Sequence, residues 1–129
     1  MRSKDLFNSR KLKVEIAETP SMIERGLMFR KKLEDDSGML FKFKRPQELR
    51  FWGLNTYLPL DIAFISSDNE IIKIGDIKPL STKVVSSDKD CVMAIEANLD
   101  FFNKNKIGIG SKINIIEEND DNIYIGFVP

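Results

Sequence analysis

The sequence contains no histidine and a single cysteine, and these two shortages exclude several classes of site. Ser-His-Asp and Cys-His catalytic systems need an imidazole as base, and many metal sites need it as ligand. One thiol makes neither a zinc–thiolate cluster nor an internal disulfide, and Cys91 lies in an apolar run where a thiol packs as a hydrophobe. Only an oxygen-ligand Ca²⁺ or Mg²⁺ site remains, and the acidic residues 117–121 lack the spacing of a calcium loop. We therefore expect no metal and no cofactor.

Net charge is also absent, because 20 Lys and Arg residues balance 20 Asp and Glu residues with both signs interspersed. Such a chain has no long-range field to attract a phosphate backbone or an anionic lipid surface. It also has no apolar run long enough for a signal peptide or a membrane-spanning helix. We expect a soluble protein with no nucleic-acid partner and no membrane insertion. A mature exported protein would look the same after removal of its leader, so export stays an alternative.

The 129 residues, 42% of them hydrophobic, suffice for one core of ordinary size. We expect a flexible N-terminal segment over residues 1–10, which are basic and polar, followed by a single domain over residues 11–129. Residues 11–17 alternate charged and aliphatic side chains, a pattern typical of a half-buried strand. Thr19-Pro20 is typical of a helix N-cap followed by proline at the first helical position.

The remaining helices, strands and loops are predicted from local sequence patterns and from the turn residues between them. We predict a helix over residues 20–28, packed through Met22, Gly26 and Phe29, and a second helix over about 99–104 capped by Asn98. Residues 78–90, which have little periodicity, should form a long surface loop. Short β-branched or aromatic runs predict strands at 39–43, 49–52, 60–65, 70–74, 92–97, 112–116 and 122–127, with hairpins at 66–69 and 117–121.

Many short strands and two short helices predict a mainly β (α+β) fold. No helix has the spacing of a crossover between parallel strands, so we expect an antiparallel β-sandwich or barrel-like domain.

Two carboxylates interrupt apolar strands and are the first candidates for a site. Asp61 lies within residues 58–65, which are otherwise apolar or proline, and Glu96 shares a face with Ala94 in the run 92–97. A desolvated carboxylate needs hydrogen-bond donors, a cation or a raised pKa. Arg25 or Arg30, at the end of the first predicted helix, would supply the cation. The favoured alternative for Asp61 is a structural carboxylate satisfied by main-chain amides or by an arginine.

A second candidate is the segment around Trp52, the only tryptophan, which is followed by Gly53, Asn55 and Thr56. An indole beside a glycine can present an open face that stacks on a sugar or another flat ligand, and the two polar side chains would orient that ligand. The alternative is that Trp52 is a core residue and that Asn55 and Thr56 form a turn into the next strand.

The same segments resemble the DUF192 family of small bacterial and archaeal proteins. The similarity covers about residues 12–116 and is carried by TPSMIERGLMFR (19–30), GMLFKF (38–43), FWGLNTYLPLDIAFI (51–65), VMAIEA (92–97) and IGIGSKI (107–113). The resemblance implies a mainly β, sandwich-like domain with a helix on its side, and no established function. Many relatives carry a leader for export or lipid attachment.

The family's characteristic positions fall on Glu24, Arg25, Gly26, Arg30, Trp52, Asn55, Thr56, Pro59, Leu60, Asp61 and Glu96. This sequence differs from the family at Gly53-Leu54, where relatives usually have Met-Lys, and the missing lysine argues against an anionic ligand beside Asn55 and Thr56.

Three functions follow from these residues. The leading hypothesis is a non-catalytic domain whose cleft holds a small polar ligand, such as a carbohydrate, on Trp52, Asn55, Thr56, Asp61 and an arginine of residues 25–30. The second is a hydrolase or lyase-type enzyme with Asp61 and Glu96 as acid and base, which requires the two carboxyl groups within about 10 Å. The third is a protein-interaction domain that uses an exposed edge strand or the 78–90 loop.

Overall fold

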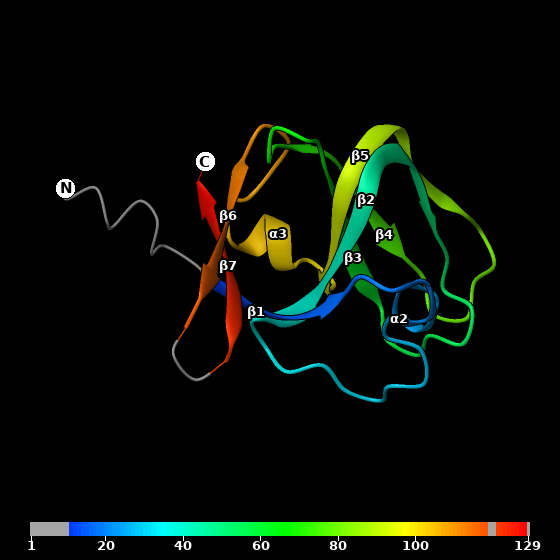
Figure 1. The fold of residues 1–129 in the computed structure, drawn as a ribbon. Helices are drawn as coiled ribbons and strands as arrows, with labels where there is room; N and C mark the ends of the chain where they lie inside the picture. Colours follow the sequence, from blue (N-terminus) through cyan, green and yellow to red (C-terminus); the bar gives the residue numbers. More distant parts are fainter. Residues whose placement is uncertain (1–10, 119–120, 129) are drawn as a thin grey trace.

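The computed structural model describes residues 11–118 and 121–128, and the segment 1–10 that we expected to be flexible lies outside the described residues. A single seven-stranded sheet organises this part of the chain, in the order β4-β3-β5-β2-β1-β7-β6 (Figure 1). Its elements, in chain order, are β1 (Lys11–Ala17), α2 (Pro20–Arg25), β2 (Ser37–Phe51), β3 (Leu60–Ile65), β4 (Ile71–Ile77), β5 (Val85–Asn98), α3 (Phe101–Lys104), β6 (Lys112–Glu117) and β7 (Ile123–Val128).

The predicted fold class, mainly β and barrel-like with two short helices, is confirmed, because the sheet curls until its two edges meet. The edge strands β4 and β6 begin next to each other, where an isolated bridge joins Glu70 to Lys112. The Ile71 N–H donates to the carbonyl of Ser111 at 2.9 Å beside that bridge. The sheet is therefore a partly closed barrel, with α3 on its concave side (Figure 1).

One strand pair contradicts the expectation that no parallel crossover exists. β1 and β2 are parallel, with Val14 opposite Gly38 and Ile16 opposite Leu40, and the other five pairings are antiparallel. The connection of residues 18–36 includes α2 and is long enough to return the chain to the same end of the sheet. The expectation of no βαβ spacing was therefore wrong for this connection, which is long enough for a crossover although its helix has only six residues.

Two further predictions of local structure were wrong. The expected loop 78–90 ends at residue 84, because Val85 pairs with Phe51 and Asp90 with Glu48 to extend β5 along the end of β2. Asn98 does not cap α3, whose N-cap is Asp100; the Asn98 side chain instead donates to the carbonyl of Leu33 at 2.9 Å. Both corrections involve partners distant in the sequence.

The start of α2 forms as its sequence predicts. The Thr19 hydroxyl accepts a hydrogen bond from the Met22 N–H at 3.2 Å, and Pro20 occupies the first turn, where its missing N–H leaves no donor unsatisfied. The helix ends at Arg25, earlier than predicted, and it packs on the sheet through Ile23 and not through Met22, which is exposed.

The sheet separates two apolar clusters, because alternate residues of a strand point to opposite faces. Side chains of β1, β5, α3, β6 and β7 fill the concave side, around Phe101, Phe102 and Phe127. The convex side is covered by α2 and the following turn, which pack Ile23 and Leu27 near Phe41 and Phe64. β3 contributes to both clusters and all six of its residues are buried.

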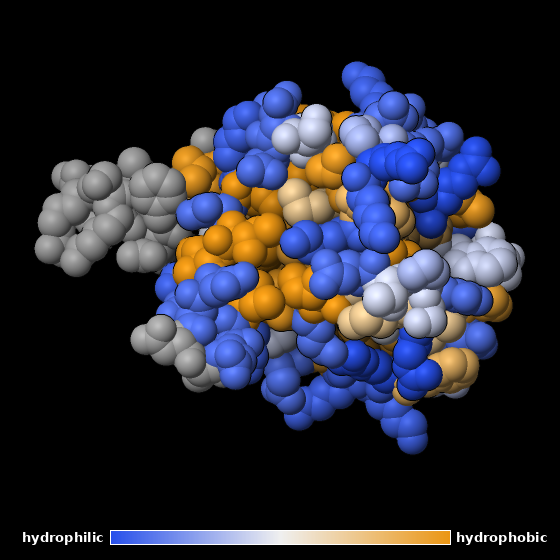
Figure 2. All heavy atoms as spheres, viewed as in Figure 1, coloured by the Kyte–Doolittle hydropathy of each residue, from blue (hydrophilic) through white to orange (hydrophobic). Residues whose placement is uncertain are grey.

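The outer surface mixes hydrophilic and apolar side chains. On the face drawn in Figure 2, hydrophilic side chains surround an apolar area over the region where Figure 1 places α3 and β7. None of the helices in the described residues is long and apolar enough to cross a membrane.

Candidate functional site

A small cavity of about 160 Å³ lies on the convex side of the sheet, between α2 with its following turn and the strands β2 and β5. Three separate parts of the chain line it. Its lining residues are Ile23, Glu24, Arg25, Gly26, Leu27, Met28, Phe41, Arg50, Phe51, Trp52, Thr56 and Glu96. We call this space the Glu96 cavity, after the residue that β5 contributes.

The turn after α2 is held over the sheet by a glycine and a main-chain hydrogen bond. Gly26 has φ +47°, and a Cβ at this position would lie 3.3 Å from the Phe41 ring, so a side chain here would be both strained and crowded. The Phe29 N–H donates to the carbonyl of Asn55 at 2.8 Å, which ties the turn to the loop that carries Trp52. These contacts hold the turn in place, and its residues 26–28 form one wall of the cavity.

The loop of residues 52–59 between β2 and β3, which we call the Trp52 loop, is held by a second close approach of main chain. The Gly53 N–H donates to the carbonyl of Ser81 at 2.8 Å, and a Cβ on Gly53 would overlap the carbonyl oxygen of Lys78. The Leu80 N–H donates to the carbonyl of Thr56 at 2.9 Å. Loop residues 78–81 therefore support the Trp52 loop from behind.

Glu96 is the most unusual group of the cavity. It is 5% exposed, and its neighbours across the sheet are Met39 and Ile62, which offer its carboxyl group no donor. Burial raises its pKa from 4.5 to about 8.

Among the described residues, no hydrogen bond or ion pair reaches the Glu96 side chain. Every side-chain oxygen or nitrogen that is fully buried in the described residues has a hydrogen-bond partner. Because the Glu96 carboxyl oxygens have no partner, they must lie at an open surface, which is the Glu96 cavity. A desolvated carboxyl group therefore lines a partly open cavity.

Three other predicted site residues line the same cavity. Trp52 is 44% exposed, so it is not a core residue, and its ring is accessible to a ligand. Thr56 is buried, and its hydroxyl donates to the carbonyl of Leu54 at 3.2 Å, which leaves its oxygen free to accept. Arg25 is exposed at the mouth, with its guanidinium 6.0 Å from the centre of the Phe29 ring. Arg25, Trp52, Thr56 and Glu96, which are far apart in the sequence, are thus brought together.

Asn55 and Arg30 lie outside the cavity lining. Asn55 is exposed with φ +54°, and its main-chain carbonyl accepts the hydrogen bond from Phe29 that ties the turn after α2 to the Trp52 loop. Arg30 forms a two-pronged ion pair with Glu15 on β1, with Nη2 2.8 Å from Oε1. This hydrogen bonding lowers the pKa of Glu15. Arg30 is therefore not the partner of either buried acid.

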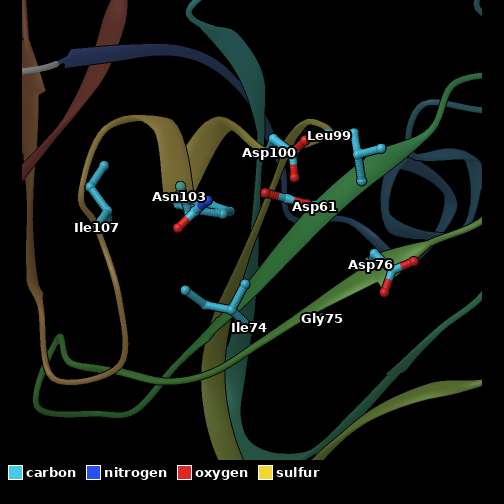
Figure 3. A pocket seen from close by; sticks show the side chains of 9 residues that line it. Asp61, Ile74, Gly75, Asp76, Leu99, Asp100, Asn103 and Ile107 are labelled. Carbon is cyan, nitrogen blue, oxygen red and sulfur yellow. The ribbon is translucent and has the colours of Figure 1, made fainter.

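Asp61 lies on the concave face and lines a different, more open hollow of about 410 Å³, beside Asp100 at the start of α3 (Figure 3). Burial raises its pKa, and main-chain hydrogen bonds from Asp100 and Phe102 oppose that rise. Its carboxylate thus satisfies the otherwise unpaired N–H groups of α3. No group of three metal-ligating side chains occurs in the described part of the chain, this hollow included.

The acid–base pair of Asp61 and Glu96 is ruled out by the strand register. In the pairing of β3 with β5, Asp61 is opposite Ala97 while Ile62 is opposite Glu96. Directly opposed residues point to the same face and successive residues to opposite faces, so the two carboxyl groups lie on opposite sides of the sheet. The hydrolase or lyase hypothesis that needs both of them in one cleft was wrong.

Several residues of the cavity lining were not predicted from the sequence. Met28, Phe41, Phe51 and Arg50 were not among the candidates, although all four lie in the cavity wall. The alternation of β2 gave a usable signal for Phe41 and Phe51, which are ten residues apart and on one face if the strand is continuous. The predicted separate strands at 39–43 and 49–52 are parts of the single strand β2, so their shared face was not recognised from the sequence.

Comparisons with known proteins agree with this fold. The model of the DUF192 family, described as Uncharacterized ACR, COG1430, matches residues 3–115. A proposed transcription regulator from Sinorhizobium meliloti 1021 has a similar structure, with a TM-score of 0.76 and 33% sequence identity, covering 89% of this chain and 81% of that chain. A protein of unknown function from Novosphingobium aromaticivorans DSM 12444 has a TM-score of 0.75 and 31% identity, covering 77% of this chain and 71% of that one. No curated protein matches the sequence.

Proposed function

The chain belongs to the DUF192 family, whose description assigns no activity, and from the site itself we propose that it is a non-catalytic domain that binds a small polar ligand in the Glu96 cavity. The observation that carries this proposal is the Glu96 carboxyl group, which is 5% exposed, has no partner among the described residues and opens on the cavity. Burying such a group without a partner costs free energy, and a ligand that pairs with it would offset that cost.

The size of the cavity favours a small ligand. The cavity volume of about 160 Å³ is well below the roughly 300–1,000 Å³ of pockets that hold drug-sized ligands or cofactors. Trp52 supplies an accessible flat ring at the wall and Thr56 a hydroxyl oxygen. One buried polar group, one ring and one hydroxyl are the elements of a recognition site.

Binding without chemistry is favoured because the strand register separates the two buried acids. With Asp61 on the other face, the Glu96 cavity contains one buried ionisable group, and the charged groups at its mouth, Glu24 and Arg25, are exposed. A general acid and a general base held together away from water are therefore missing from this set of residues.

The test is a ligand-observed NMR screen of the purified protein with a library of simple sugars, polyols, small amines and small carboxylic acids. We expect at least one class to give saturation-transfer signals that Trp52→Ala weakens, because this change removes one wall of the cavity. Tyr57→Ala is the matched control, since Tyr57 is 47% exposed, close to the 44% of Trp52, but does not line the cavity.

If no compound gives a signal that differs between the wild-type protein and Trp52→Ala, with circular dichroism showing both to be folded, the cavity is not a binding site. The same conclusion follows if Trp52→Ala and Tyr57→Ala weaken every signal equally.

A further inference from the structure

The surroundings of Glu96 restrict the charge of the ligand as well as its size. In the described residues no lysine, arginine or main-chain donor satisfies this carboxyl group, although the chain has 20 basic residues. Across the sheet it faces Met39 and Ile62, and in the cavity it faces Phe41 and Phe51. No cationic side chain of the described residues therefore pairs with the Glu96 carboxyl group in this cavity.

The rings of the lining add to this preference. Phe41 and Phe51 meet edge to face, with ring centres 4.9 Å apart, and Trp52 forms the outer wall. Aromatic faces carry partial negative charge and attract cations, and indole does so most strongly. Rings together with a desolvated carboxyl group form a set of contacts that suits an ammonium group better than a sugar hydroxyl.

The other charged groups around the cavity do not cancel this preference. Glu24 and Arg25, from α2, are exposed at the mouth, where water screens them. Arg50, from β2, is also exposed, and its Nε lies 3.3 Å from the Glu48 carboxylate. The Trp52 loop contributes no ionisable side chain to the lining. Glu96 is thus the one buried ionisable group among the residues that line the cavity.

We infer that the ligand of the Glu96 cavity is a small organic cation of the ammonium class, whose positive head pairs with the Glu96 carboxylate against the rings of Phe41, Phe51 and Trp52. This inference rests on the proposed function and makes it specific. It replaces the broader expectation of a polar or carbohydrate ligand with one charge and one orientation.

The inference also requires proton release on binding. Burial raises the pKa of Glu96 to about 8, so the carboxyl group is mainly protonated at neutral pH and has to lose its proton to pair with a cation. Affinity for the cation should therefore rise about tenfold for each pH unit up to about pH 8 and then level off. A neutral ligand that accepts a hydrogen bond from the protonated carboxyl group would show the opposite trend.

The experiment compares matched pairs of probes by isothermal titration calorimetry at about pH 6 and about pH 8.5. One pair is choline and the neutral alcohol in which carbon replaces its quaternary nitrogen, and the other is butylammonium and butanol. For at least one pair we expect the cation to bind the wild-type protein about tenfold more tightly than its neutral partner at the higher pH. Glu96→Gln should abolish this preference, whereas Asp61→Asn, which changes the buried acid of the opposite face, should keep it.

Each other outcome overturns the inference. It fails if neither cation binds better than its neutral partner, or if the preference survives in Glu96→Gln. If sugars or other neutral compounds bind in a manner that depends on Trp52 while the cations do not, the inference fails and the proposed function stands. If nothing binds at the Glu96 cavity, both fail together.

Discussion

Replacing Glu96 with glutamine should make the protein more stable at alkaline pH and leave its stability nearly unchanged at about pH 5. The substitution keeps the size of the side chain and removes its ability to ionise. The native surroundings, with Met39 and Ile62 across the sheet and no donor among the described residues, favour the neutral form. The free energy of unfolding of the wild-type protein therefore contains a term that depends on the ionisation of Glu96.

The sign and size of this term follow from the raised pKa. Below about pH 4.5, Glu96 is protonated in both the folded and the unfolded chain, so its contribution does not change with pH. Between 4.5 and about 8 the folded state binds more protons, so stability falls as the pH rises. A rise of the pKa from 4.5 to about 8 corresponds to at most about 5 kcal/mol, all of it lost above about pH 8.

Urea denaturation followed by far-ultraviolet circular dichroism, at pH values from about 5 to about 9, measures this term directly. The quantity to plot is the unfolding free energy of Glu96→Gln minus that of the wild type, because other titrating groups cancel in the difference. It should grow by several kcal/mol between about pH 5 and about pH 8.5. Glu24→Gln, which removes an exposed carboxylate at the mouth of the same cavity, is the control. A difference that stays within about 1 kcal/mol over this range would refute the reasoning.

Three further predictions concern Asp61, Gly53 and the ion pair of Arg30 with Glu15. Asp61→Ala should reduce the unfolding free energy in urea by about 1–3 kcal/mol, because it leaves main-chain N–H groups at the start of α3 without an acceptor; a loss below about 0.5 kcal/mol would contradict that role. Gly53→Ala should lower the unfolding free energy by about 1–3 kcal/mol or prevent folding, because its Cβ would overlap a main-chain oxygen of the 78–84 segment. Gly108→Ala is the control, and it should leave the melting temperature nearly unchanged because no atom lies within 4 Å of the new Cβ. Equal effects of the two substitutions would contradict the role of crowding at Gly53. A double-mutant cycle on Arg30 and Glu15 should give a coupling of at most about 1 kcal/mol, since both side chains are at least 37% exposed, and a much larger coupling would mean that water screens the pair less than its exposure implies.

The sequence identified the two buried acids but not their relationship. Asp61 and Glu96 stood out because each interrupts an apolar strand, and both prove to be buried, at 8% and 5% exposure. Which face each one takes depends on the pairing of β3 with β5, in which Asp61 is opposite Ala97 and Ile62 is opposite Glu96, partners that are far apart in the chain. A shift of one residue in that register would have put both carboxyl groups on one face.

The wrong predictions of the fold also result from contacts between segments that are distant in the sequence. Residues 85–90 lack a periodic pattern, yet they form a strand because the end of β2 lies beside them and pairs with them. The parallel pairing of β1 with β2 likewise depends on where the chain returns after α2. Local propensity is weak in both segments, and hydrogen bonds to distant partners decide their conformation.

Short-range physics, acting within a few residues, was sufficient for the alternation of β1, the capped start of α2 at Thr19-Pro20, the hairpin that joins β3 to β4 and the mainly β character of the chain. Contacts between distant segments decided the rest: the curl of the sheet, the face that each carboxylate occupies, and the assembly of a cavity from α2, β2, the Trp52 loop and β5. The reason is that capping and turn formation involve neighbouring residues, whereas the environment of Glu96, and with it the charge it prefers, is created by side chains that only the folded chain brings together.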